Sequence, residues 1–326
     1  MQQYALLVHK IPVGVFGGSG YAGRELCSIL NKHPHFELAF ATANAQRGEH
    51  AFLGGREVSF IATDDAPIRS AELVFSALPH GSSATWVERA QEHGARVVDL
   101  SSDLRPGHTT LKVPYGLTET ARETLRGAEV IANPGCYPTA ILLALVPLLE
   151  RGLIRPGSTI VVDAASGVTG AGNSPKPELL FGEVTGNYRA YSVGNEHRHL
   201  PEMRAFVDRY STDADLLFTP HLLPVSRGIL ATITVQLTYE LDEPLRVWDQ
   251  HFAGEAFVEI SSQLPQLRDV VHRNVARISA RTAANQRVPT LIVLAAIDNL
   301  VKGAAGQAIQ NANVSYGFAE GSGLPR

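Results

Sequence analysis

The sequence predicts a two-domain α/β protein, in which a doubly wound parallel sheet is followed by an α+β domain with a mixed, largely antiparallel sheet. Three observations support this fold class. The length of 326 residues suits two domains better than one. The first half alternates short apolar runs with amphipathic segments, which is typical of β-α-β units. From about Arg151 onward the apolar runs lengthen and strong helical patterns become rare. We therefore predict one domain over residues 1–150 plus 299–326 and a second over 151–298.

Five apolar runs in the first half are predicted to be strands. They are nearly continuous in hydrophobicity, as expected for a parallel sheet that is covered on both faces, and Gly, Pro, Asn or Asp bounds each of them. Amphipathic segments such as YAGRELCSILNKH (21–33) and SSATWVERAQEHG (82–94) lie between them and are predicted to be helices. The five predicted strands are 11–17, 36–42, 73–79, 96–102 and 129–135.

The second half contains three longer apolar runs, STIVVDAAS (158–166), ILATITVQLTY (229–239) and TLIVLAAID (290–298). They are separated by wide intervals without strong helices, so a mixed or mostly antiparallel sheet is expected. The Ala- and Gln-rich stretch 298–317 is predicted to be a helix that returns to the first domain.

Composition excludes several classes of protein. A hydrophobic fraction of 44% with 18% charged residues indicates a folded soluble protein, and a formal net charge of -4 argues against nucleic-acid or membrane-surface partners. The longest apolar run, AILLALVPLLE (140–150), is too short to span a bilayer. The N-terminal MQQYALLVHK lacks a basic region before its apolar residues, so it is not expected to be a secretory signal. With two cysteines in the whole chain, no disulfide framework is expected, and a cytoplasmic protein is predicted.

A glycine-rich turn, GGSGYAG, joins the first predicted strand to the first predicted helix. In this context Gly17 permits a tight turn, Gly20 lets the backbone approach a pyrophosphate, and Gly23 lets the helix lie close to the strand. We therefore predict a Rossmann-type dinucleotide site. The residues expected to contact the cofactor here are Gly17, Gly18, Ser19, Gly20, Tyr21, Ala22 and Gly23.

The end of the second strand bears on the identity of the cofactor. An acidic residue there would bind the ribose hydroxyls of NAD, but the segment ATANAQRGE (41–49) has no acid before Glu49 and contains Arg47. This favours NADP(H), although Arg47 also fits a solvated surface charge.

The stretch NPGCYPTA (133–140) places Cys136 at a strand-to-helix junction. Pro134 and Gly135 end the strand, and Pro138 suits the first turn of the following helix. The partial positive charge of a helix N-terminus favours thiolate over thiol, so Cys136 is the candidate nucleophile, while Cys27 is interpreted as a core residue. A thiolate beside a nicotinamide can form a thioester that hydride transfer connects to an aldehyde.

The segment GNEHRHLPE (194–202) is the candidate source of an acid/base group. Its H-x-H-x-x-E spacing also fits a metal site built from His197, His199 and Glu202, or a polar surface loop. General acid/base catalysis by one histidine, oriented by a carboxylate, fits best, and no metal is predicted.

Eight motifs together resemble the family of N-acetyl-γ-glutamyl-phosphate reductases, and they extend from residue 13 to about 311. This resemblance implies an aspartate-semialdehyde-dehydrogenase-like architecture and NADPH-dependent reductive dephosphorylation of an acyl phosphate in arginine biosynthesis, with inorganic phosphate released. It also implies a homodimer or homotetramer. The motifs are GGSGYAGREL, DLSSDLR, YGLTE, NPGCYPTA, ASGVTGAG, EHRHLPE, PHLLPVSRGI and DNLVKGAAGQAIQN.

The resemblance also implies roles for single residues. Cys136 matches the nucleophile, and the H-R-H pair matches the acid/base, for which we prefer His197 over His199. Arg105 matches a position associated with the substrate phosphate, although it would also fit as a turn-closing residue before Pro106. Matches to substrate-pocket positions are Ser166, Tyr191 and Glu202, with Arg227 as either a substrate-carboxylate ligand or the partner of an acid. Further expected cofactor contacts are Thr42, Pro79, His80, Asn299 and Lys302, the last of which also fits a solvated helix start.

Three alternatives stay open. The chain would also fit a reductase of a related acyl phosphate, either aspartyl or aminoadipyl. It would also fit an NADPH-binding sensor without turnover, or a metal-dependent hydrolase.

Overall fold

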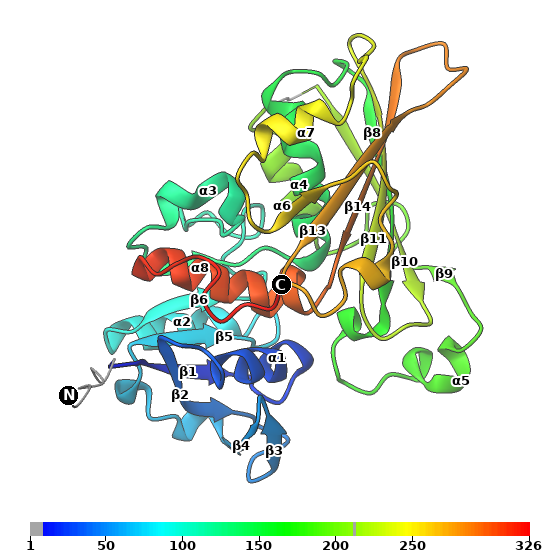
Figure 1. Ribbon diagram of the computed structural model, residues 1–326. Helices are drawn as coiled ribbons and strands as arrows, with labels where there is room; N and C mark the ends of the chain where they lie inside the picture. The colour runs from blue at the N-terminus through cyan, green and yellow to red at the C-terminus, as the bar shows by residue number, and fades with distance from the viewer. Residues whose placement is uncertain (1–8, 211–212) are drawn as a thin grey trace, which may run out of the picture.

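The computed structural model describes residues 9–210 and 213–326. Most of the N-terminal MQQYALLVHK, for which a secretory signal was not expected, therefore lies outside the described residues. The chain forms two seven-stranded sheets, which Figure 1 shows at the lower left and upper right with α8 between them. Within the described residues, no helix has the length and apolar character needed to cross a membrane.

The first sheet has the strand order β3-β4-β2-β1-β5-β6-β7. All neighbouring pairs are parallel except the β3–β4 hairpin. Its strands are β1 (Ile11–Phe16), β2 (Phe36–Thr42), β3 (His50–Leu53), β4 (Arg56–Ile61), β5 (Leu73–Ser76), β6 (Arg96–Asp99) and β7 (Val130–Ala132).

Both faces of this sheet are covered. Along β5, Leu73 and Phe75 belong to a core shared with helices α1 and α8, whereas Val74 faces a second core that includes α2. Such two-sided burial explains why the sequence runs were continuously apolar. The helices of this domain are α1 (Tyr21–Leu30), α2 (Ser83–Glu92), α3 (Thr118–Leu125) and α8 (Gly306–Tyr316).

The second sheet has the order β12-β13-β14-β11-β8-β10-β9. The central β11 is antiparallel to both β8 and β14, while β10–β8 and β12–β13 are parallel. The mixed, largely antiparallel character predicted for this sheet is confirmed. Its strands are β8 (Thr159–Gly167), β9 (Arg189–Ala190), β10 (Asp215–Leu223), β11 (Ile229–Gln236), β12 (Val258–Ile260), β13 (Ala276–Thr282) and β14 (Thr290–Ile297).

Helix α4 (Cys136–Glu150) packs on the second sheet, and its residues from Tyr137 to Leu149 are all buried. This differs from the expected division at residue 151, which assigned the helix to the first domain. The apolar surface of α4 is nearly continuous around the helix because it is enclosed by β11, β14, α6 (Leu200–Val207) and α7 (Arg246–His251).

The remaining helical segments are short. One of them, the π-helix Val301–Ala305, opens the predicted C-terminal helix and runs directly into α8. The others are α5 (Phe181–Val184) and the 3₁₀ turns Thr63–Asp65, Ile68–Ser70, Val168–Ala171, Pro177–Leu179 and Leu267–Asp269.

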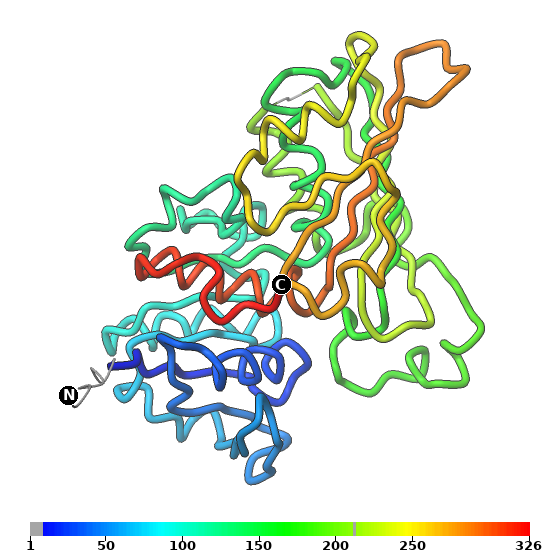
Figure 2. The backbone as a smooth tube through the Cα atoms, viewed as in Figure 1, coloured from blue at the N-terminus to red at the C-terminus, as the bar shows by residue number. Residues whose placement is uncertain are grey.

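The C-terminal tail after α8 folds back toward the boundary between the two sheets (Figure 2). Its Pro325 carbonyl accepts a hydrogen bond of 2.9 Å from Asn274 N–H, which precedes β13. Near β1 and α1, the buried His33 ring contacts the Ser322 carbonyl at 2.8 Å. The tail thus contacts both domains, in agreement with a C-terminal segment that returns to the first.

Candidate active site

A cleft of about 600 Å³ is lined by the glycine-rich turn, the start of α4, the loop 169–176 and the segment before α8. It therefore draws residues from both sheets' domains. The predicted site residues that line it are Gly17, Ser19, Gly20, Tyr21, Ala22, Gly23, Pro79, His80, Arg105, Cys136, His199 and Asn299. Those that do not are Gly18, Thr42, Arg47, Ser166, Tyr191, His197, Glu202, Arg227 and Lys302.

The glycine-rich turn has the geometry of an anion site. Gly17 has a φ of 72°, and a β-carbon on Gly23 would lie 2.2 Å from the Gly17 carbonyl oxygen, so both positions require glycine. At the N-cap Gly20, a β-carbon would meet only the Gly17 carbonyl oxygen, at 3.5 Å. Among the described residues, no side chain caps α1, so the N–H groups of its first turn lie free beside the cleft. These residues fit the pyrophosphate of a dinucleotide.

Thr42 holds the glycine-rich turn by two hydrogen bonds. Its hydroxyl accepts a 3.2 Å hydrogen bond from Gly17 N–H, and its carbonyl accepts one of 2.7 Å from Gly18 N–H. Thr42 is fully buried, so it positions the turn and does not reach the cleft. This corrects the expectation that Thr42 and Gly18 contact the cofactor themselves.

Arg47 is exposed and lies outside the cleft lining, so its expected contact with the cofactor stays a prediction. Asn44 takes the position at the cleft that sequence reasoning had given to Arg47. Across the cleft, Asn173 of the second domain donates a 3.1 Å hydrogen bond to the Ser19 carbonyl. Sequence reasoning missed Asn173, because no motif indicated that its loop would face the glycine-rich turn.

Cys136 is the first residue of α4 and is half-buried at the cleft, as the strand-to-helix interpretation predicted. Its electrostatics differ from the expectation. Burial raises the pKa of the Cys136 thiol above its ordinary value, and the charges of Arg198 and Arg105 with the Tyr137 N–H oppose this only in part. The thiol of the free protein is therefore protonated at neutral pH, because the loss of hydration outweighs the helix N-terminus. Cys27 is a buried core residue, as predicted, and burial raises its pKa to about 12.

A buried group of polar side chains fixes the backbone just before Cys136. Glu202 Oε1 accepts hydrogen bonds from Gly135 N–H (2.9 Å) and the Tyr115 hydroxyl (2.7 Å). Glu202 Oε2 pairs with Arg105 Nη1 at 3.2 Å. Because Glu202 is fully buried outside the cleft lining, it positions the nucleophile's turn, which corrects its expected role as a substrate ligand.

The two histidines occupy different surroundings. His199 lines the cleft, and a β-carbon on Gly135 would lie 2.6 Å from its Nε2, so this nitrogen faces the residue before Cys136. Burial holds the pKa of His199 well below 6.5, so its imidazole is neutral.

His197 instead packs against the rings of Tyr137, Tyr191 and Phe218 and does not line the cleft. Its Nδ1 accepts a 3.1 Å hydrogen bond from the backbone N–H of His199. Burial lowers the pKa of His197 to about 4. The geometry thus favours His199 over His197, contrary to the expected order.

Glu202 is not available as a metal ligand for this segment, because its carboxylate is bonded to Arg105, Tyr115 and Gly135 N–H. Over residues 9–210 and 213–326, the one set of three potential ligand side chains within 4.8 Å of one another is Glu119, Glu255 and Glu320. Arg122 pairs with two of these carboxylates, Glu255 and Glu320, so this set is an ion-pair network.

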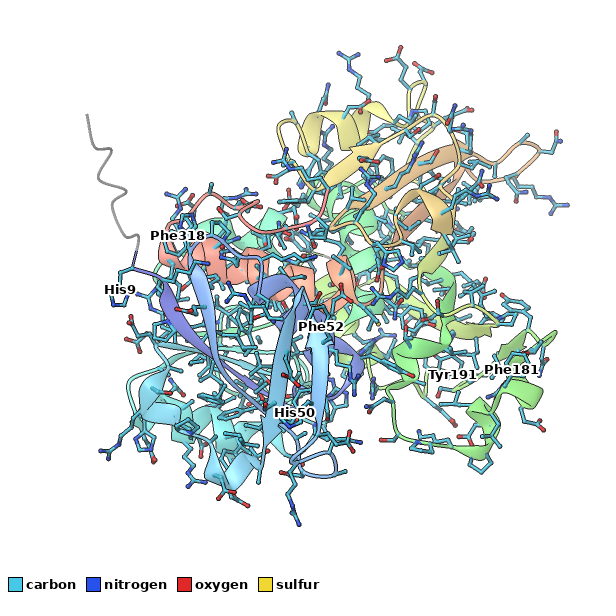
Figure 3. All side chains as sticks on the ribbon, turned by 60° about the horizontal axis from the view of Figure 1, so that its bottom comes forward. His9, His50, Phe52, Phe181, Tyr191 and Phe318 are labelled. Carbon is cyan, nitrogen blue, oxygen red and sulfur yellow. The ribbon has the colours of Figure 1, made fainter. Side chains whose placement is uncertain are left out.

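Ser166 and Tyr191 lie outside the cleft lining. The buried Ser166 hydroxyl donates to its neighbour's carbonyl, Gly167 O, at 3.0 Å, and the Tyr191 and Tyr137 hydroxyls are 3.1 Å apart. Figure 3 places Tyr191 on the same side of the molecule as Phe181, away from His50 and Phe52. Neither side chain lines the cleft, which differs from their expected contact with substrate: Tyr191 packs against the His197 ring, and Ser166 is buried.

Asn299 and Arg227 are each held by protein groups. Asn299 lines the cleft and is fixed by bonds with Gly228 N–H (2.8 Å) and the Thr169 hydroxyl (2.9 Å). Arg227 pairs with Glu25 at 2.5 Å and Asp298 at 3.5 Å, so its alternative role as the partner of an acid is the one observed.

Lys302 points away from the cleft. Its amine bonds to Glu119 (2.6 Å) and Gln310 (2.9 Å), and its side chain is fully buried. It is therefore neither a cofactor contact nor solvated, which corrects both expectations.

A dinucleotide-type sheet whose cleft also contains a cysteine at a helix start is typical of NAD(P)-dependent semialdehyde dehydrogenases. Two family models match the chain accordingly. The model "Semialdehyde dehydrogenase, NAD binding domain" matches residues 12–128, and "Semialdehyde dehydrogenase, dimerisation domain" matches residues 136–299.

Curated relatives of this chain show which reductase within the class it resembles. N-acetyl-gamma-glutamyl-phosphate reductase of Desulforudis audaxviator is 40% identical, with 96% of this chain and 98% of the relative covered. The enzyme of the same name from Laribacter hongkongensis is 38% identical with the same coverage, and that of Neisseria meningitidis is 37% identical with 97% of each covered. The chain belongs to the N-acetyl-γ-glutamyl-phosphate reductase family, which confirms the resemblance seen in the motifs.

Solved structures agree on the fold. Aspartate semialdehyde dehydrogenase II from Vibrio cholerae, complexed with ASA, gives a TM-score of 0.75 at 19% identity, covering 94% of this chain and 98% of that one. The Candida albicans aspartate semialdehyde dehydrogenase with NADP gives 0.66 at 16% identity, with the same coverage. At these identities the likeness shows the architecture alone, and that architecture is the one predicted.

Proposed function

We propose that the protein reduces N-acetyl-γ-glutamyl phosphate to N-acetylglutamate 5-semialdehyde and inorganic phosphate with NADPH, as a step of arginine biosynthesis. The observation that carries the proposal is the position of Cys136, which opens α4 in the same cleft as the glycine-rich turn and the neutral His199. Membership of the reductase family names the substrate.

The residues present fit a nicotinamide dinucleotide. The free N–H groups at the start of α1 would hold the pyrophosphate, and Pro79, His80 and Asn299 line the continuation of the cleft toward Cys136. The phosphorylated form, NADP(H), is favoured because Asn44, a neutral side chain, stands at the cleft after β2 where an NAD-specific site would carry an acid. When bound, the cofactor supplies the hydride that converts the enzyme thioester to a thiohemiacetal.

The chain's own residues perform acyl transfer. His199 takes the proton of the Cys136 thiol, and the thiolate attacks the γ-carbonyl carbon. First-turn N–H groups of α4, which no side chain of the described part of the chain caps, stabilise the oxyanion. The carbon–oxygen bond to phosphate then breaks, the bonding electrons leave with the phosphate, and the proton on His199 passes to it. A Cys136 thioester remains.

Release follows from reduction of that thioester. The thiohemiacetal oxygen re-forms a carbonyl as the carbon–sulfur bond breaks, so the semialdehyde leaves and Cys136 becomes a thiolate again. A proton from solvent restores the thiol, which the burial of Cys136 favours.

The reverse reaction tests the proposal. N-acetylglutamate semialdehyde, NADP and phosphate are mixed with the enzyme, and NADPH absorbance is followed. The expected result is NADPH formation that requires phosphate, is lost in Cys136→Ser and is retained in the core control Cys27→Ser. A substantial rate in Cys136→Ser would overturn the nucleophile. Activity only with the aspartyl or aminoadipyl semialdehyde would replace the substrate, and silence on all three would favour the NADPH-binding sensor.

The assembly and location belong to the same proposal. The dimerisation-domain match supports a homodimer or homotetramer, and the low cysteine usage supports a cytoplasmic enzyme. Sedimentation equilibrium of the purified protein decides the assembly, and a monomer at micromolar concentration would contradict it.

A further inference from the structure

The arginine that the motif DLSSDLR supplies to the cleft is already occupied by protein groups. Arg105 Nε donates to the Asn133 carbonyl (2.8 Å), Nη2 to the Leu100 carbonyl (2.6 Å) and Nη1 to Glu202 (3.2 Å). Only 3% of Arg105 is exposed, and its charge is balanced by Glu202. Three of its five N–H donors are thus used and its charge is balanced, so less of Arg105 is available to a phosphoryl group than of an arginine without partners.

A second arginine in the same cleft has the opposite character. Arg198 lies between the two histidines in the sequence. It is exposed, and it lines the cleft with Cys136 and His199. Among residues 9–210 and 213–326, its guanidinium has neither a hydrogen-bond acceptor nor a carboxylate partner at bonding distance. All of its N–H groups are therefore available to a ligand.

The charge of Arg198 acts at the reacting centre. Among the charges around Cys136, that of Arg198 lowers the pKa of the thiol the most, and it also lowers the pKa of the His80 imidazole, which lines the same cleft. A guanidinium with free, planar N–H donors matches the oxygens of a phosphoryl group better than any other side chain.

We propose that Arg198 binds the phosphoryl group of the acyl phosphate, and inorganic phosphate in the reverse direction. This inference rests on the proposed function. The phosphoryl oxygen is bonded to the carbon that Cys136 attacks, so the phosphoryl group lies beside Cys136, in the cleft that Arg198 also lines. As the carbon–oxygen bond breaks, the electrons it releases go to the phosphate, whose growing charge the guanidinium offsets. Arg105 and Glu202 then act as positioning residues for the turn that carries Cys136.

Steady-state kinetics of the reverse reaction test this assignment. A hydrogen-bonded charge pair of this kind corresponds to about tenfold to hundredfold in affinity, so Arg198→Gln is expected to raise the KM for phosphate by about that factor. The KM for the semialdehyde should stay within about twofold of the wild-type value. Arg198→Lys should recover part of the lost phosphate affinity, because lysine keeps the positive charge but lacks the paired planar N–H donors of arginine. Arg246→Gln, which removes the same charge from an exposed position on α7, should behave as the wild type.

Alkylation gives a readout that does not depend on turnover. In a Cys27→Ser background, phosphate should slow the reaction of iodoacetamide with Cys136, and Arg198→Gln should remove that protection. Unchanged protection, an unchanged KM for phosphate, or a rise in the semialdehyde KM alone would overturn the assignment, the last because it would place the substrate carboxylate on Arg198. A wild type that forms no NADPH but is protected by phosphate would sink the proposed function and leave the phosphate site standing.

Discussion

Gly303 lies directly against Cys136, because a β-carbon on Gly303 would come within 2.8 Å of the Cys136 Cβ. Gly303 belongs to the π-helix that precedes α8, and such segments interrupt regular helices most often at functional sites. The close approach lets residues from the C-terminal segment form one wall of the cleft beside the nucleophile.

Substituting Gly303 by alanine should therefore displace Cys136 or the π-helix by several tenths of an ångström. Misplacement of a reacting group on that scale reduces kcat by about tenfold to hundredfold, and this is the loss expected from steady-state kinetics. Gly182→Ala is the matched control, since its β-carbon meets nothing within 4 Å on the short helix α5. Equal kcat values for the two variants would show that the contact is not needed for catalysis.

Gly20→Ala separates cofactor binding from folding. The Gly20 backbone has a φ of -69°, which alanine adopts freely, and the added methyl group would meet only the Gly17 carbonyl oxygen. Thermal stability should change little, whereas the Kd for NADPH should rise at least about tenfold because the methyl group blocks the pyrophosphate. Fluorescence titration and a melting curve on the same sample measure both quantities. If Gly20→Ala bound NADPH with wild-type affinity, the pyrophosphate would not bind at this turn.

The Lys302–Glu119 pair should matter to stability and not to cofactor binding. Both side chains are fully buried, so Lys302→Met leaves an unpaired buried carboxylate and should cost about 3–5 kcal/mol in the free energy of unfolding. The double variant Lys302→Met with Glu119→Met removes both charges and should recover most of that loss. Urea unfolding measures these values. If the Kd for NADPH rose in the double variant, Lys302 would contribute to cofactor binding after all.

Buried histidines make stability depend on pH. His33 is fully buried, and burial lowers its pKa from 6.5 to about 4. The unfolded chain therefore binds more protons between these two values, so the contribution is present above pH 6.5 and is lost as the pH falls toward 4. For His33 alone the loss between pH 7 and pH 5 is about 1–2 kcal/mol.

His33→Asn tests this dependence, because the amide oxygen can replace Nδ1, which accepts from His35 N–H and Phe36 N–H. Urea unfolding at pH 7 and pH 5 should show a smaller difference in this variant than in the wild type. His93→Asn, at an exposed position after α2, should keep the wild-type difference. A variant whose pH dependence equals that of the wild type would assign the effect to the other buried histidines.

Local sequence patterns predicted five of the seven strands of the first sheet and missed the β3–β4 hairpin at its edge. The run 36–42 is β2 as observed, and the strands 11–17, 73–79, 96–102 and 129–135 differ from β1, β5, β6 and β7 mainly at their ends. Less was predicted of the second sheet. β10 was missed because Pro220 interrupts it, and β13 because its charged residues obscure the apolar alternation.

The sequence alone determined the features that depend on neighbouring residues: the alternation of strands and helices, the glycine-rich turn and the start of a helix at Cys136. Only the tertiary structure decided which polar groups are free. Arg105 and Lys302 are occupied by Glu202 and Glu119, and the same packing brings His199 and Arg198 to the cleft while it buries His197 among aromatic rings. These partners are far apart in the chain, and whether a charged side chain meets a carboxylate or faces the cleft depends on long-range packing that no local pattern records.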